Sequence, residues 1–126
     1  MGHRVLLVED SPTMRQLLTF ALRPLSGLTV EEAVDGLDGL KRVQSRAYDL
    51  ALVDINMPLM DGLKLISLIR QDEKNKDIPI VIISTEGGMD VKEKTDALGV
   101  NAYITKPVMA RNVLDTVKSL LPSQDG

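Results

Sequence analysis

The chain has 126 residues, a formal net charge of −3, and neither cysteine nor tryptophan. This length predicts one domain that is large enough to bury its own core. The composition, 44% hydrophobic and 26% charged, is ordinary for a globular protein. Without cysteine, disulfides, thiolate metal sites and a cysteine nucleophile are excluded. Because no run of lysine or arginine occurs, direct nucleic-acid binding is not expected.

No apolar stretch approaches the ~20 residues of a membrane-spanning helix. The apolar run at residues 5–8 is also too short for the core of a signal peptide. We therefore expect a cytoplasmic protein with no membrane insertion. The domain is predicted to span residues 1–126, with an ordered core at 3–122 and a frayed polar tail at 123–126.

Five short apolar runs alternate with five stretches of helical periodicity. The runs lie at residues 4–8, 28–32, 49–53, 78–83 and 101–105. Three of them are nearly continuous in valine, isoleucine and leucine, which is typical of strands buried on both faces. The second run alternates between apolar and polar residues and predicts an edge strand.

Helical periodicity first appears at residues 14–22, after the start signal formed by Ser11 and Pro12. Further helices are predicted around residues 37–43, 63–69, 91–98 and 113–121. The fourth has few apolar positions and ends at Gly99, while Pro122 stops the fifth. This alternation predicts an α/β fold with a parallel sheet covered by helices on both faces.

Polar side chains follow four of the predicted strands at their carboxyl ends, the edge at which open α/β sheets bind ligands. These residues are Glu9 and Asp10 after the first strand, Asp54 after the third, Ser84 and Thr85 after the fourth, and Lys106 after the fifth. Clustered carboxylates repel one another unless a cation lies among them. An all-oxygen set with no histidine or cysteine nearby favours Mg²⁺.

A lysine and a hydroxyl beside such an ion form a pocket for phosphoryl oxygens, and a central aspartate can accept the group as an acyl phosphate. Any one of these residues alone would be interpreted as a cap, a turn residue or a solvated side chain. Their joint position at strand ends favours a site. His3, which precedes the first strand, is expected to be solvated and is given no role.

Four segments carry a resemblance to a known family: residues 5–11 (VLLVEDS), 54–62 (DINMPLMDG), 79–84 (PIVIIS) and 103–107 (YITKP). In this order and at these separations, the chain resembles the receiver domain of bacterial two-component response regulators over essentially its whole length. Single-domain, CheY-like members are the nearest type. The resemblance implies a doubly wound, five-stranded parallel sheet of the (βα)5 flavodoxin-like class, in strand order 2-1-3-4-5.

The resemblance also implies roles for individual residues. Asp54 would be the phosphoacceptor, and a histidine kinase would be the donor. Lys106 would contact the phosphoryl oxygens, would pair with unmodified Asp54, and would precede a cis peptide bond to Pro107. The Mg²⁺ ligands would be Glu9, Asp10, Asp54 and the backbone carbonyl of Asn56.

A switch would connect this site to a separate output protein. Ser84 would move toward the phosphoryl group and Tyr103 would turn inward behind it, which would remodel the face of the fourth helix, fifth strand and fifth helix. Asn56 and Glu86 would tune how fast water removes the phosphoryl group. The glycine pair at residues 87–88 would form a mobile loop.

The expected function is a phosphoacceptor switch that promotes its own phosphorylation and dephosphorylation, not an enzyme with a separate substrate. Chemotaxis or motility is the leading pathway. A phosphorelay shuttle and a degenerate receiver that binds partners without phosphorylation are the alternatives. A phosphatase of the haloacid dehalogenase class would need an acid in place of Asn56. A flavin binder would need a hydroxyl- and glycine-rich loop where Glu9 and Asp10 stand.

Overall fold

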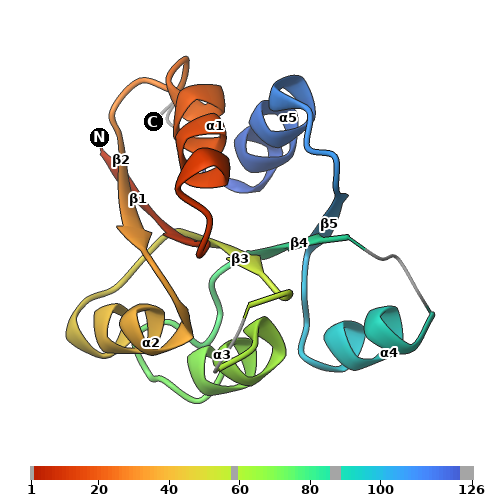
Figure 1. Ribbon diagram of the computed structural model, residues 1–126. Helices are drawn as coiled ribbons and strands as arrows, with labels where there is room; N and C mark the ends of the chain where they lie inside the picture. Colours follow the sequence, from red (N-terminus) through yellow and green to blue (C-terminus); the bar gives the residue numbers. More distant parts are fainter. Residues whose placement is uncertain (1, 58–59, 86–88, 123–126) are drawn as a thin grey trace.

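The computed structural model describes residues 2–57, 60–85 and 89–122, in which five strands and five helices alternate as predicted (Figure 1). The strands are β1 (His3–Val8), β2 (Leu28–Ala33), β3 (Leu50–Asp54), β4 (Ile80–Ser84) and β5 (Ala102–Thr105). The helices are α1 (Pro12–Leu22), α2 (Gly36–Ser45), α3 (Gly62–Ile69), α4 (Met89–Ala97) and α5 (Ala110–Leu120). The predicted tail at 123–126 lies outside the described residues.

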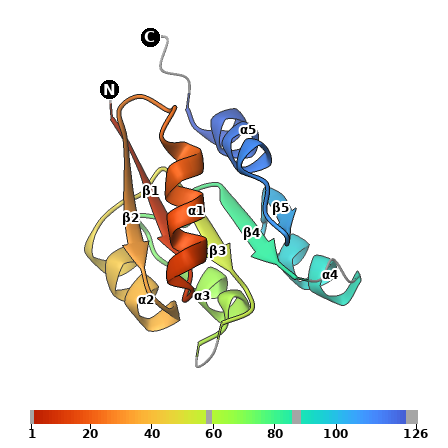
Figure 2. The same ribbon diagram turned by 45° about the horizontal axis from the view of Figure 1, so that its top comes forward.

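All strand pairs are parallel, and the order β2-β1-β3-β4-β5 confirms the predicted doubly wound α/β topology. The edge position predicted for β2 is also confirmed. Helices α1 and α5 cover one face of the sheet, and α2, α3 and α4 cover the other (Figure 1, Figure 2). Of the helices in the described part of the chain, none combines the length and apolar character needed to cross a membrane.

The core consists of two aliphatic layers, one on each face of the sheet. Successive strand residues alternate between them, so that Leu6 and Val8 face α2 and α3 while Val5 and Leu7 face α1 and α5. The three interior strands are almost completely buried. This burial supplies most of the stabilisation, at about 25 cal/mol per Å² of apolar surface. It also holds the carboxyl ends of the strands in fixed positions.

The loops at the carboxyl edge are shaped by caps that begin the helices. The Ser11 hydroxyl accepts a hydrogen bond from the N–H of Met14 at 3.3 Å, so α1 starts directly after the acidic pair. Helix α3 starts against β3, where a Cβ added to Gly62 would lie 2.6 Å from the carbonyl oxygen of Asp54. Only glycine permits this approach, which brings the start of α3 against the end of β3.

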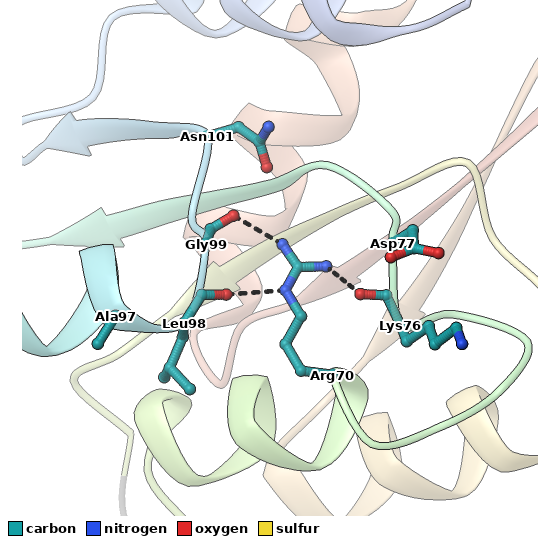
Figure 3. Close-up of a pocket in the computed structure, with 7 residues that line it drawn as sticks. All are labelled: Arg70, Lys76, Asp77, Ala97, Leu98, Gly99 and Asn101. Atoms are coloured by element: carbon teal, nitrogen blue, oxygen red, sulfur yellow. Dashed lines mark hydrogen bonds between the residues drawn. The ribbon is translucent and has the colours of Figure 1, made fainter.

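Arg70, which directly follows α3, holds the two residues that directly follow α4 (Figure 3). Arg70 donates through Nε to the carbonyl of Leu98 and through Nη2 to that of Gly99, both at 2.8 Å. Its Nη1 donates to the carbonyls of Lys76 and Ile78 in the loop before β4, at 2.9 and 2.7 Å. Since the carbonyls at the end of a helix lack partners within it, Arg70 supplies hydrogen bonds that the helix itself cannot make.

His3 differs from the sequence prediction. It is the first residue of β1, and only 11% of its side chain is exposed. Its Nδ1 lies 3.7 Å from Oδ2 of Asp49, which follows α2 in the chain. The expected solvation of His3 is therefore wrong, because the first strand begins one residue earlier than the apolar pattern indicates.

Candidate functional site

Three carboxylates meet at the carboxyl edge of the sheet. Strand β1 leads into Glu9 and Asp10, and Asp54 is the last residue of the adjacent strand β3. One carboxylate oxygen from each residue lies within 4.8 Å of the other two. The predicted convergence of these three acids is therefore confirmed, because neighbouring parallel strands end at the same level.

Burial makes this cluster electrostatically unfavourable by itself. Glu9 and Asp54 are each 1% exposed, whereas Asp10 is exposed. Oε2 of Glu9 accepts the N–H of Ser11 at 3.0 Å, but within the described part of the chain its buried Oε1 has no hydrogen-bond partner. Burial, followed by the charge of Asp54, raises the pKa of Glu9 to about 7.

The donor set fits a hard divalent cation. It offers carboxylate oxygens without histidine or cysteine, and the buried Oε1 of Glu9 has no hydrogen-bond partner among the described residues. Mg²⁺ prefers such ligands and needs only one or two carboxylates, because it retains several waters. Asn56, predicted to contribute its carbonyl, lies two residues beyond Asp54 and donates its own N–H to Asp54 Oδ1 at 2.8 Å. Its carbonyl remains a predicted ligand.

Lys106 supplies the positive charge that faces the acids. Its Nζ lies 3.2 Å from Oδ2 of Asp54, which confirms the predicted pairing of these two side chains. The backbone N–H of Lys106 donates to the carbonyl of Ser84 at 2.8 Å, which extends the β4–β5 ladder to the site. The Lys106–Pro107 peptide bond is cis, as predicted. Among the described residues, each oxygen of Asp54 is thus held by one donor, Oδ1 by the N–H of Asn56 and Oδ2 by Lys106.

The two predicted switch residues lie on adjacent strands. Ser84 is the last residue of β4 and is 5% exposed, and Tyr103 lies on β5. The Tyr103 hydroxyl donates to Oδ1 of Asp96 at 3.0 Å and also contacts the hydroxyl of Thr95, so it is bonded to α4. Burial raises the pKa of Tyr103 to about 12. The movement of Ser84 and Tyr103 on phosphorylation remains a prediction.

Of the two residues predicted to tune dephosphorylation, only Asn56 lies within the described part of the chain. Glu86, and the glycine pair predicted to form a mobile loop, lie outside the described residues. Asn56 is described, and its Oδ1 accepts hydrogen bonds from the backbone N–H of Thr85 at 3.0 Å and from the Thr85 hydroxyl at 3.3 Å. Sequence reasoning placed Thr85 at a strand end but gave it no role. Its position directly after Ser84 was the only available signal.

Comparisons with known proteins agree on one family. The model of the response regulator receiver domain matches residues 5–118. The chemotaxis protein CheY of Pseudomonas aeruginosa is 31% identical over 123 residues, which cover 98% of this chain and 99% of that protein.

Solved structures extend the likeness to three dimensions. The chemotaxis protein CheY4 of Vibrio cholerae superposes with a TM-score of 0.89 at 30% identity, covering 96% of this chain and 100% of that one. The receiver domain of the sensor histidine kinase PA1611 from Pseudomonas aeruginosa has a TM-score of 0.85 at 27% identity, covering 98% and 100%. That structure contains a magnesium ion coordinated in its active-site cleft.

Proposed function

The chain belongs to the response regulator receiver family, and on this basis we propose that it is a phosphoacceptor switch. Asp54 accepts a phosphoryl group from the phosphohistidine of a histidine kinase. The observation that carries this proposal is the environment of Asp54. The Asp54 side chain is buried, lies beside two other carboxylates, and pairs with Lys106. A structural ion pair would not need two further carboxylates beside it.

The chemistry follows from the groups around Asp54. A carboxylate oxygen forms the new bond to phosphorus as the bond from phosphorus to the histidine nitrogen breaks, and that nitrogen keeps the electron pair. Lys106, 3.2 Å from Oδ2, stabilises the negative charge that the phosphoryl oxygens bring into the site. A Mg²⁺ held by Glu9, Asp10 and Asp54 would supply the remaining positive charge, and the similar receiver of PA1611 has a magnesium ion coordinated in its active-site cleft.

Hydrolysis resets the switch. The oxygen of a water bonds to phosphorus, the bond between phosphorus and Asp54 breaks, and the carboxylate is regenerated as inorganic phosphate leaves with the water's protons. Asn56 lies beside Asp54, to which it donates its backbone N–H. We propose that its side chain influences the approach of water to the reacting group.

The output surface is proposed to be the face formed by α4, β5 and α5. Support comes from Tyr103, whose hydroxyl bonds to α4, so that a change in its orientation would alter how α4 is held. A separate chemotaxis or motility protein is the favoured partner, because CheY of Pseudomonas aeruginosa matches the chain along nearly its whole length. A phosphorelay shuttle is the second candidate, since a receiver from a sensor histidine kinase has the same fold.

Intact mass spectrometry tests the proposal. Acetyl phosphate and Mg²⁺ should add the mass of one phosphoryl group to the wild type, and the reaction should be stopped by rapid acid quench so that short-lived adducts are retained. Asp54→Asn should abolish the adduct. Asp115→Asn, which changes an exposed aspartate on α5, should leave it intact. No adduct in the wild type, or an undiminished adduct in Asp54→Asn, would refute the assignment.

A further inference from the structure

Thr85 and Asn56 connect the ends of the two strands beside the phosphoacceptor. Strands β3 and β4 are neighbours, with Asp54 opposite Ile83, and the ladder continues through the hydrogen bond from the N–H of Ile55 to the Ile83 carbonyl at 3.1 Å. Asn56 and Thr85 follow directly beyond this pairing. The bond between them therefore spans the carboxyl edge of the sheet, next to Asp54.

The two hydrogen bonds from Thr85 determine how the Asn56 amide is oriented. Both the backbone N–H and the hydroxyl of Thr85 donate to the same acceptor, Oδ1. A half-turn of the amide would present its NH₂ group to these two donors, and NH₂ cannot accept a hydrogen bond. Oδ1 is thus held toward β4, and the NH₂ group is left facing away from Thr85. Among the described residues, no hydrogen bond uses this NH₂ group.

The orientation matters because Asn56 is attached to the site by a second bond. Its backbone N–H donates to Oδ1 of Asp54 at 2.8 Å, so its main chain cannot move far from the phosphoacceptor. With the main chain held by Asp54 and the amide oxygen held by Thr85, the side chain retains one arrangement. An amide NH₂ can donate to the oxygen of a water or of a phosphoryl group but cannot remove a proton. Asn56 can therefore orient a water but cannot act as its base.

We propose that Thr85 is a positioning residue that holds the Asn56 amide and thereby sets the rate at which water removes the phosphoryl group from Asp54. The inference rests on the proposed function. The step is the hydrolysis written above, and Thr85 touches neither the phosphoryl group nor the water in it. Its effect is transmitted through its hydrogen bonds to Oδ1 of Asn56. If these bonds were weakened, the Asn56 amide would move more freely and would orient the water less well.

The rate test uses the full chain, loaded with acetyl phosphate and Mg²⁺ and followed by rapid acid quench and intact mass after the donor is removed. Thr85→Val removes the hydroxyl donor, and loss of the phosphoryl group should slow by about three- to ten-fold, within the range that misplaced groups cause. Thr85→Ser should restore a rate close to the wild type. Thr29→Val, a matched change on the exposed edge strand β2, should have no effect.

A double-mutant comparison separates positioning from general structural damage. In an Asn56→Ala background, Thr85→Val should cause no additional slowing, because the amide through which it acts is absent. Equal slowing with and without the Asn56 side chain would overturn the inference, as would a wild-type rate in Thr85→Val. Absence of any adduct in the wild type would instead overturn the proposed function.

A second readout requires neither phosphate nor metal. The side-chain NH₂ of Asn56 can be observed by ¹⁵N relaxation in the unmodified protein, where the two bonds from Thr85 should keep its order parameter high. Thr85→Val should lower that value and Thr85→Ser should preserve it. An Asn56 amide that is equally mobile in all three proteins would contradict the positioning contact, whatever the labelling experiments give.

Discussion

Two groups of charged side chains on this sheet have opposite charge balances. On the edge strand β2, the single carboxylate of Glu31 is contacted by three guanidinium groups and one phenol. Its partners are Arg4 at 3.0 Å, Arg42 at 3.5 Å, Arg46 at 2.8 Å and the Tyr48 hydroxyl at 2.8 Å. At the carboxyl edge, the three clustered carboxylates have one ion-pair partner in the described part of the chain, the ammonium of Lys106, which contacts Asp54. The first group has an excess of positive charge and the second an excess of negative charge.

The comparison separates a structural cluster from a functional one. The Glu31 cluster satisfies its central carboxylate with protein groups alone and fastens β1, α2 and the loop after α2 to the edge strand. Within the described residues, the Asp54 cluster leaves a buried oxygen of Glu9 without a hydrogen-bond partner, and such a group is costly unless something else neutralises it. Charge density alone therefore does not mark a site. The informative feature is a buried carboxylate oxygen that no described residue satisfies.

The largest expected effect tests the Glu31 cluster. Glu31→Ala should lower the free energy of unfolding by about 2 to 3 kcal/mol, between the values for exposed and for buried ion pairs, because Glu31 is half-buried and its three arginine partners are partly exposed. Urea denaturation measures this loss. Glu73→Ala, which removes a carboxylate from an 87% exposed side chain, is the matched control and should change stability by less than about 0.5 kcal/mol.

Glu31→Ala also tests whether the Glu31 cluster affects the phosphorylation of Asp54. At a temperature where Glu31→Ala is still folded, its labelling at Asp54 should match the wild type, because the Glu31 cluster contributes no group to that site. A fall in labelling that exceeds the unfolded fraction would mean that the two clusters are coupled.

The second effect is a pH dependence of stability produced by Glu9. Its pKa is about 7 in the folded chain against an ordinary 4.5, so the folded state binds the proton more tightly than the unfolded state. The contribution of Glu9 to stability is complete below about pH 4.5 and is lost as pH rises through 7. Without Mg²⁺, this loss should be on the order of 2 kcal/mol.

Thermal unfolding between pH 5 and 8 checks this dependence. Mg²⁺ should raise the melting temperature more at pH 8 than at pH 5, because it binds the deprotonated carboxylate. Glu9→Gln should flatten the metal-free profile, since it removes the titrating group. Superimposable profiles for Glu9→Gln and the wild type would show that the unpaired oxygen does not have the energetic cost argued here.

A third, smaller effect concerns the phenol in the Glu31 cluster. Tyr48 is 4% exposed and donates to Oε1 of Glu31 at 2.8 Å. Tyr48→Phe keeps the ring and removes this bond, which should cost about 1 kcal/mol in urea denaturation. Repeating the change in a Glu31→Ala background should give almost no loss. A loss of the same size in both backgrounds would show that the hydroxyl acts independently of Glu31.

The difference between the clusters also explains what the sequence could predict. Glu9, Asp10, Asp54 and Lys106 each lie at the carboxyl end of a recognisable strand, and parallel strands bring such ends to one edge. The Glu31 cluster has no comparable rule, because its members come from two strands, a helix and the loop that follows that helix. Their meeting depends on the register that sets Leu6 opposite Glu31.

Two other features escaped prediction for a similar reason. The reach of Arg70 to the end of α4 depends on how two helices sit on the sheet, and nothing in the local sequence of α3 indicates it. The contact between Thr85 and Asn56 joins two strand ends that are 29 residues apart. Periodicity and caps predict the elements, whereas contacts between side chains of distant elements require the packed structure.

The smallest expected effect arises at Asp10, the exposed member of the acidic cluster. Asp10→Asn removes one of three like charges, so without metal it should raise the free energy of unfolding by about 0.5 kcal/mol, a small gain because water screens an exposed carboxylate. With saturating Mg²⁺ the sign should reverse, because the wild type then gains a ligand that the variant lacks. Paired urea denaturations in EDTA and in Mg²⁺ measure both values.

Asp115→Asn, which changes an exposed residue on α5, is the control and should show no such reversal. A variant that loses stability in EDTA as well would mean that Asp10 is held by favourable contacts, and that the deficit of positive charge is confined to the two buried acids.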